Sequence, residues 1–206
     1  MPKAKNVEEY IAMHRAGIAS NSECGTSHYN LAVGLIGQRK FDEAEKELHA
    51  AIDCSPSLAE AYVQLGGICL KRGDLDGCLE YNKQATKARA GFFEGYGNIG
   101  FVHLQRGEAD EAITALKKAI SFNSRFIQAQ STLASAYLMS GLIDESIEAN
   151  LKVIELDPNF AIAYNNLAIA YLEKGEYDKA VENCDKAIKL GYEVAPEILK
   201  EIEEHR

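Results

Sequence analysis

Small and apolar residues recur along this chain at the spacing of amphipathic helices, and the whole pattern repeats. Residues 159–190 hold two helical patterns on either side of a tight Lys-Gly-Glu turn, with Ala168, Ala180 and Ala187 where two packed helices would touch. The same skeleton returns in steps of 34 residues, so that Tyr164 is preceded by Gln130, Tyr96, Tyr62 and His28. A fixed period of this length predicts a helical solenoid.

The period divides most of the chain into complete units of two helices each. Counting places from the first residue of a unit, the seventh place is always leucine or isoleucine, and the eighth and twentieth are always small. Helices that cross closely need small side chains at the contact, because the distance between helix axes follows side-chain size. We expect five such units: 25–58, 59–92, 93–126, 127–160 and 161–194.

Partial units are expected at both ends, so that residues 1–206 form a single solenoid. Residues 1–24 match the second helix of a unit and predict a half-repeat that caps the N-terminus, with Asn6 and Glu9 as a helix start signal. Its apolar face consists of Val7, Tyr10, Ile11 and Ile18. Residues 195–206 predict a C-terminal capping helix, since Pro196 suits a first turn and a narrow apolar stripe follows it among charges.

The turn between the two helices of a unit contains glycine in four units and Arg39 in the first. Glycine adopts the left-handed cap conformation cheaply, whereas Arg39 in that conformation is expected to cost about 1 kcal/mol.

Composition narrows the function classes. The formal net charge is −9 and no block of lysine or arginine is present, which argues against nucleic-acid binding. The five cysteines form no Cys-x-x-Cys pair, so we expect small buried side chains in a reducing compartment, with no metal site and no cofactor. Neither a signal peptide nor a membrane-spanning run is visible, which predicts a cytoplasmic protein without membrane insertion.

The units resemble the tetratricopeptide repeat (TPR), a resemblance that covers nearly the whole chain. The pattern is fullest at Tyr164, Leu167, Ala168, Tyr171, Ala180 and Ala187. The resemblance implies an all-α fold, a right-handed superhelical solenoid of antiparallel helix pairs. The departures from it are His28 and Gln130 at the leading aromatic place, and Cys69 and His103 at the tyrosine place. We expect both histidines to be hydrogen-bonded packing residues and not ligands.

The resemblance also implies a concave groove, lined by the first helix of each unit, that binds peptides or helices. Its usual contacts come from the second, fifth, sixth, ninth, twelfth and thirteenth places. Side-chain amides at the sixth place suit a peptide backbone because they donate and accept together, although asparagine there is also common in the family. The residues expected to line the groove are Tyr29, Asn30, Val33, Val63, Gln64, Gly67, Gly97, Asn98, Phe101, Ser131, Thr132, Ser135, Asn165, Asn166 and Ile169.

These features favour a non-enzymatic adaptor that binds a peptide or an amphipathic helix of another protein. The lysine, asparagine and arginine residues of the carboxylate-clamp adaptors are missing, so the partner is not expected to be an Hsp70 or Hsp90 tail. No catalytic constellation is visible. The alternatives are a self-assembling scaffold, similar to the repeat protein that coats magnetosomes, or a subunit of an enzyme complex. Lys71, Arg72, Arg106 and Lys174 form either a basic rim for an acidic partner or ordinary helix C-terminal cations.

Overall fold

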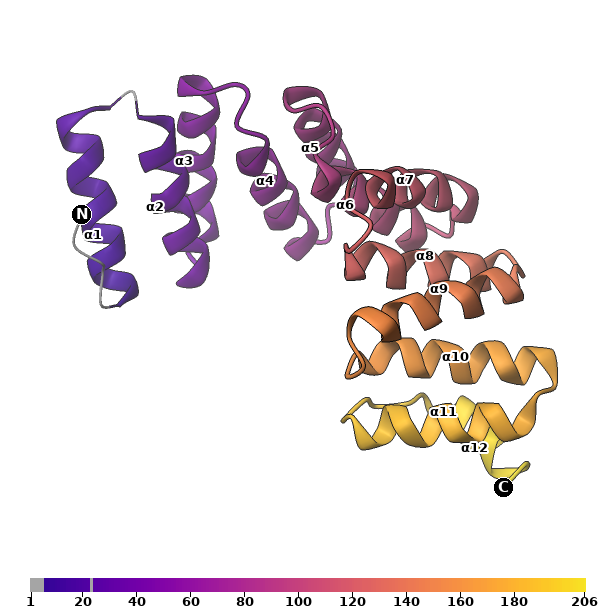
Figure 1. Cartoon of the computed structure of the whole chain (residues 1–206). Coiled ribbons are helices and arrows are strands. Elements are labelled where there is room, and N and C mark those ends of the chain that lie inside the picture. Colours follow the sequence, from indigo (N-terminus) through magenta and orange to yellow (C-terminus); the bar gives the residue numbers. More distant parts are fainter. Residues whose placement is uncertain (1–5, 23) are drawn as a thin grey trace. The chain divides into compact units, whose positions relative to one another are not determined.

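The structure is a computed structural model that describes residues 6–22 and 24–206. Over these residues the chain forms twelve helices and no strand, which confirms the predicted all-α fold (Figure 1). The helices are α1 (Val7–Ser20), α2 (Gly25–Gly37), α3 (Phe41–Cys54), α4 (Ala59–Lys71), α5 (Leu75–Ala88), α6 (Phe93–Gln105), α7 (Ala109–Phe122), α8 (Ile127–Met139), α9 (Ile143–Leu156), α10 (Ala161–Lys174), α11 (Tyr177–Lys189) and α12 (Pro196–Glu203).

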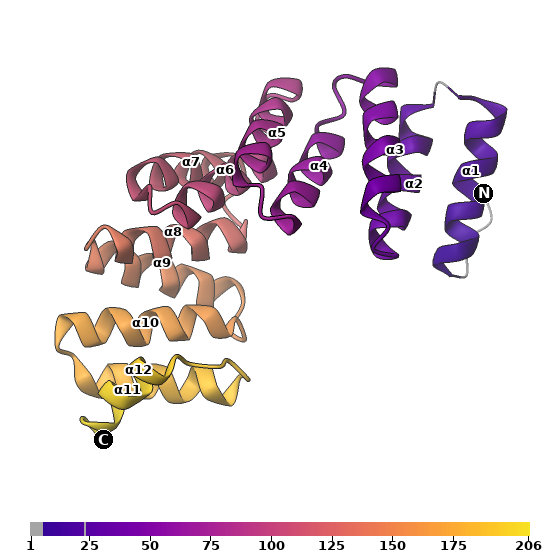
Figure 2. The ribbon, with the colours of Figure 1, turned by 180° about the vertical axis from the view of Figure 1, so that it is seen from behind.

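Each expected unit contains one helix pair, from α2 and α3 in the first unit to α10 and α11 in the fifth (Figure 2). The even-numbered helices α2 to α10 are therefore the first helices of their units, and the odd-numbered helices α3 to α11 are the second helices. Helix α1 precedes the first pair and α12 follows the last, as the capping pattern predicts. Residues 1–5 and Glu23 of the expected N-terminal half-repeat lie outside the described residues.

The small residues of the period lie where the two helices of a pair approach most closely. In the second unit, Leu65 at the seventh place is 1% exposed and Cys78 at the twentieth place is 3% exposed. A Cβ atom added to Gly66 would stand 2.5 Å from the side-chain nitrogen of Asn82, so this helix contact has no room even for alanine. Side-chain size at these places therefore sets how closely the helices pack.

All five inter-helix turns share one backbone conformation. Gly73 has φ of 78°, and Arg39, at the matching place of the first unit, has φ of 59°. In both turns the next N–H donates back to a helix carbonyl at 2.9 Å, from Lys40 to Leu35 and likewise in the second unit. This bond completes the helix cap. The left-handed conformation predicted for Arg39 is confirmed.

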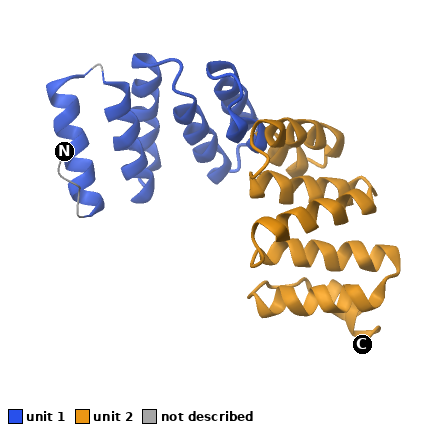
Figure 3. Ribbon diagram, viewed as in Figure 1, with its two compact units in different colours: residues 1–98 blue, residues 99–206 orange. Residues whose placement is uncertain are grey.

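The chain divides into two compact units, residues 1–98 and residues 99–206 (Figure 3). In the N-terminal compact unit, α1 packs tightly on α2. A Cβ atom added to Gly34 of α2 would lie only 2.8 Å from the Ile11 side chain of α1. Asn6 caps α1 as predicted, accepting from the Glu9 N–H at 2.8 Å. Val7 was expected on the packed face but is 48% exposed, because it lies in the first turn of the helix. A single solenoid over residues 1–206 stays a prediction.

In the C-terminal compact unit, α12 covers the apolar face of the last helix pair. Its Ile202 is fully buried and packs with Cys184 and Ala187 of α11. Beyond the helix, His205 stacks on Tyr177 with ring centroids 3.5 Å apart. The predicted C-terminal capping helix is thus docked by apolar and aromatic contacts together.

Candidate protein-interaction surface

Several large apolar side chains are exposed on the first helices of the helix pairs. They are Val33 on α2 (37% exposed), Leu70 on α4 (37%), Met139 on α8 (53%) and Ile162 on α10 (42%). These residues occupy the ninth, twelfth, thirteenth and second places of their units. All four are therefore at places where the first helix of such a repeat is expected to meet a partner.

Sequence reasoning named Val33 but missed the other three. The signal was present in the sequence, because an apolar residue at a second, twelfth or thirteenth place stands out once the period is known. The predicted list was confined to the fifth, sixth and ninth places, and those include several small and polar residues.

In the N-terminal compact unit, the predicted residues of α2 and α4 face one another. Tyr29 packs against a buried cluster that includes Ala61 and Leu65 of α4, and its pKa is raised, chiefly by burial and further by the Glu60 carboxylate. Val63 is half-buried beside Phe92, whereas Gly67 is exposed and a Cβ atom there would meet nothing within 4 Å. Gly67 therefore leaves space for a partner side chain on α4, the helix that also carries the exposed Leu70.

The sixth-place asparagine of α6 points into the helix packing. The amide nitrogen of Asn98 donates to the side-chain oxygen of Asn82 on α5 at 2.9 Å. Asn82 is fully buried and donates in turn to the carbonyl oxygen of Cys78 at 2.8 Å. This donor is therefore used inside the fold and not offered to a peptide backbone.

A matching polar network occurs in the C-terminal compact unit. The amide nitrogen of Asn166 on α10 lies 3.1 Å from the Ser135 hydroxyl and 3.5 Å from the side-chain oxygen of the buried Asn150 on α9. Ser131, Asn165 and Asn166 are 6–7% exposed. The structure thus places these three predicted groove residues mainly in the packing between helices. The predicted residues of this compact unit that keep partial exposure are Phe101, Thr132, Ser135 and Ile169.

Three different residue types at the fourth place make the same hydrogen bond. The His28 Nε2, the Tyr164 hydroxyl and the Gln130 Nε2 all contact the carbonyl oxygen that lies six residues before them in the chain. His28 also lies 2.6 Å from Glu47, and His103 lies 2.5 Å from Glu108. Both histidines are hydrogen-bonded packing residues, as predicted.

The cations at the ends of the first helices form ion pairs with the preceding unit. Arg72, directly after α4, contacts Asp42 at 2.7 Å and Glu45 at 2.9 Å on α3, and Lys174 at the end of α10 contacts Asp144 on α9 at 2.7 Å. These ion pairs link neighbouring helix pairs, which speaks against a free basic rim at Arg72 and Lys174.

The described residues bring together no group of three or more metal-ligating side chains. Cys69, Cys78 and Cys184 are buried, and burial raises the pKa of the Cys69 and Cys184 thiols. In the part of the chain that the structure describes, no helix combines the length and the apolar character needed to cross a membrane.

Models of the tetratricopeptide repeat match residues 29–91, 93–126 and 149–182. Among solved structures, the chain is similar to YrrB, a TPR protein with an unusual peptide-binding site, at 23% identity over 86% of this chain and 92% of YrrB, with a TM-score of 0.70. It is also similar to MamA, at 27% identity over 84% of this chain and 98% of MamA, with a TM-score of 0.70. PilF of Pseudomonas aeruginosa is 17% identical over 89% of each chain, with a TM-score of 0.76. No curated protein matches the sequence.

Proposed function

The chain belongs to the tetratricopeptide repeat family of protein-interaction scaffolds, and we propose that it binds a peptide or an amphipathic helix of another protein along its first helices. The observation that carries this proposal is the exposure of Val33 and Leu70 on consecutive first helices, with open space at Gly67 nearby in the sequence. Apolar anchors in such settings dominate binding energy. The peptide-binding site of the similarly folded YrrB supports a peptide as the ligand class.

Charge substitution on this surface tests the proposal. Peptides are selected from a random library displayed on phage against the whole chain, and their affinities are measured for wild type and for the double variant Val33→Glu and Leu70→Glu. Both side chains are more than a third exposed, so we expect the helix content to stay unchanged. We expect affinity to fall at least about tenfold, which corresponds to the loss of one anchor.

The matched control is Leu151→Glu, because Leu151 is 45% exposed and lies on the second helix α9. This variant should bind the selected peptides as wild type does. Undiminished affinity in the double variant, or an equal loss in the control, would overturn the assignment to the first helices.

Self-assembly is a second candidate, and exposed apolar side chains on second helices favour it. Phe122, Leu151 and Ile188 are 50%, 45% and 44% exposed. If these residues join copies of the chain, light scattering over a concentration series should show oligomers that the double variant Leu151→Glu and Ile188→Glu abolishes. A strict monomer at every concentration would exclude this candidate.

A further inference from the structure

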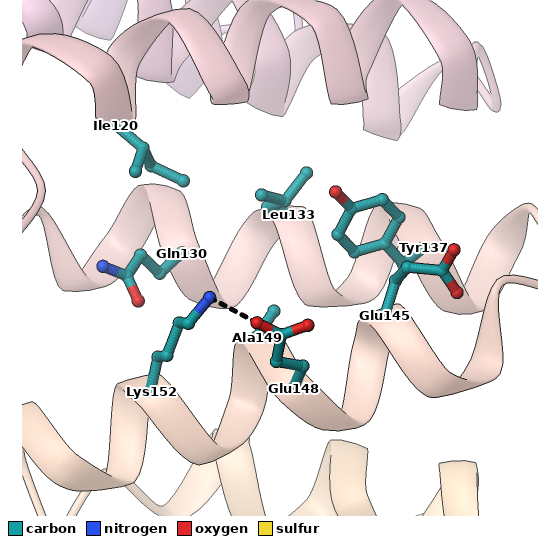
Figure 4. A pocket seen from close by; sticks show the side chains of 8 residues that line it. All are labelled: Ile120, Gln130, Leu133, Tyr137, Glu145, Glu148, Ala149 and Lys152. Carbon is teal, nitrogen blue, oxygen red and sulfur yellow. Dashed lines mark hydrogen bonds and ion pairs between the residues drawn. The ribbon is translucent and has the colours of Figure 1, made fainter.

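An open pocket lies in the C-terminal compact unit, and none of its residues belongs to the expected groove. Its volume is about 240 Å³, and helices α7, α8 and α9 supply its walls (Figure 4). The lining residues are Ile120, Gln130, Leu133, Tyr137, Glu145, Glu148, Ala149 and Lys152. A cavity of about 150 Å³ can hold a benzene ring, so this pocket has room for one aromatic side chain.

The pocket exists because Gln130 stands where three other units have tyrosine. In the fifth unit, the matching Tyr164 fills this position with its ring, and its hydroxyl contacts the carbonyl oxygen of Pro158 at 3.1 Å. Gln130 makes the equivalent hydrogen bond to Ser124 through its amide nitrogen. The backbone contact is therefore kept, while the volume of the ring is left empty.

Gln130 also leaves one polar atom without a partner. Its side-chain oxygen Oε1 is buried and has no hydrogen bond to any described residue, although the side chain is only 7% exposed. Its amide nitrogen holds Ser124, which fixes which end of the amide is the unpaired acceptor. Because almost no surface of this oxygen is open to the pocket, a ligand there cannot donate to it, and ring space and charge decide what the pocket binds.

Lys152, the cation beside the pocket, corresponds to Lys186, which lies over the Tyr164 ring in the fifth unit. There, the Lys186 ammonium lies 5.7 Å from the centroid of the Tyr164 ring. Lys152 occupies the same place of the fourth unit and lines the pocket, where it pairs with Glu148 at 2.7 Å. A ring entering the pocket would therefore meet a cation at its face, a contact that stabilises aromatic ligands.

We propose that this pocket binds an aromatic side chain of a partner protein, whose ring occupies the space that Tyr164 fills in the fifth unit. Leu133 and Ile120 contact the ring, as expected for an aromatic anchor. Glu145 and Glu148 give the rim a net negative charge beside Lys152, so basic residues next to the aromatic residue fit the partner segment. This site is separate from the first-helix surface, and each can fail without the other.

Small aromatic probes test the proposal on the whole chain. N-acetyl-tryptophanamide and N-acetyl-tyrosinamide are titrated against the ¹⁵N-labelled protein, together with the phenylalanine and leucine analogues. The chain has no tryptophan, so the fluorescence of the tryptophan probe reports its own surroundings. We expect shifts of the amide resonances around the pocket and a blue-shifted probe emission. The leucine probe should bind about 2- to 5-fold more weakly than the aromatic probes, because it has no ring to meet the Lys152 cation.

A substitution at Gln130 tests whether the space of the missing ring is the binding site. Gln130→Tyr fills the pocket with the side chain that other units carry, so it should fold and abolish probe binding. Gln128→Tyr, an exposed substitution on the same helix, is the control and should bind as wild type does.

Three results would overturn the proposal. One is that the probes cause no resonance shifts in α7 to α9, and another is that Gln130→Tyr binds them as wild type does. The third is that the leucine probe binds wild type as tightly as the aromatic probes, which would assign the pocket to any apolar side chain. If the wild type dimerises and Gln130→Tyr abolishes the dimer, the occupant is a second copy of this chain and not another protein.

Discussion

Replacing Arg39 by glycine should stabilise the protein, because Arg39 is held in a backbone conformation that favours glycine. Its φ is 59°, and it lies in an exposed turn between α2 and α3. The four matching turns all use glycine, with φ between 71° and 78°. The hydrogen bond that closes the turn, from Lys40 to Leu35, involves backbone atoms only and is kept in Arg39→Gly.

The expected gain follows from the backbone alone. A residue with a Cβ atom in the left-handed region costs about 1 kcal/mol relative to glycine. Arg39 donates no side-chain hydrogen bond and forms no ion pair with any residue in the described ranges, so little should offset this gain. For a chain of this length, about 1 kcal/mol corresponds to a rise of roughly 2–4 °C in Tm.

The reverse substitution checks the reasoning at a second turn. Gly73 has φ of 78°, and a Cβ atom there would meet nothing within 4 Å. The cost of Gly73→Arg is therefore conformational and not steric, and we expect a loss of about 1 kcal/mol. Gln38→Gly is the control, because Gln38 has φ of −86° and gains nothing from a glycine.

Urea unfolding followed by circular dichroism at 222 nm measures all three variants. The midpoint should rise in Arg39→Gly and fall in Gly73→Arg, with an unchanged slope, so that the shift reports stability and not denatured-state compactness. The reasoning is refuted if Arg39→Gly leaves the midpoint unchanged or lowers it, or if Gln38→Gly raises it as much.

Two further predictions follow from pKa shifts. Folding raises the pKa of Tyr29 above its ordinary value of 10.0. The contribution of the protonated Tyr29 to stability is therefore complete below pH 10 and is lost at higher pH. Above pH 10, the urea midpoint of Tyr29→Phe should fall less steeply than that of wild type. The Ser27 hydroxyl donates to the Cys24 sulfur at 3.2 Å and lowers the pKa of that thiol, whereas burial raises the pKa of Cys184. In mass spectrometry after brief iodoacetamide treatment, Cys24 should be alkylated well before Cys184, and Ser27→Ala should slow Cys24; equal rates for the two cysteines would contradict this.

The helical architecture was predictable from the sequence because it depends on side-chain size at a few places that recur every 34 residues. Arg39, His28 and His103 were predictable for the same reason, since each replaces a known residue type whose structural role is clear. Val7 was placed wrongly because periodicity gives the face of a helix but not the point at which its neighbour ends.

The pocket at Gln130 was only half visible in the sequence. The departure from an aromatic residue was evident, but its consequence depends on whether the backbone hydrogen bond survives without the ring. The contact from Gln130 to Ser124 shows that it does, so the missing ring leaves a space and not a distorted turn. Sequence alone cannot separate those two outcomes, because both begin from the same substitution.

The asparagines show that a place in the repeat does not determine a role by itself. The buried twenty-fourth place alternates along the first four units, from Leu48 to Asn82 to Leu116 to Asn150. A sixth-place asparagine that follows a buried asparagine, as Asn98 follows Asn82, donates inward to it. Shape therefore repeats every unit, whereas this polar pairing repeats every second unit. Thr132, the sixth-place residue that follows Leu116, has no amide, and its hydroxyl donates to the carbonyl oxygen of Gln128 at 2.8 Å. An amide at the sixth place escapes the inward pairing only where the preceding twenty-fourth place is apolar, which directs the search for peptide contacts to Gln64, the residue that follows Leu48.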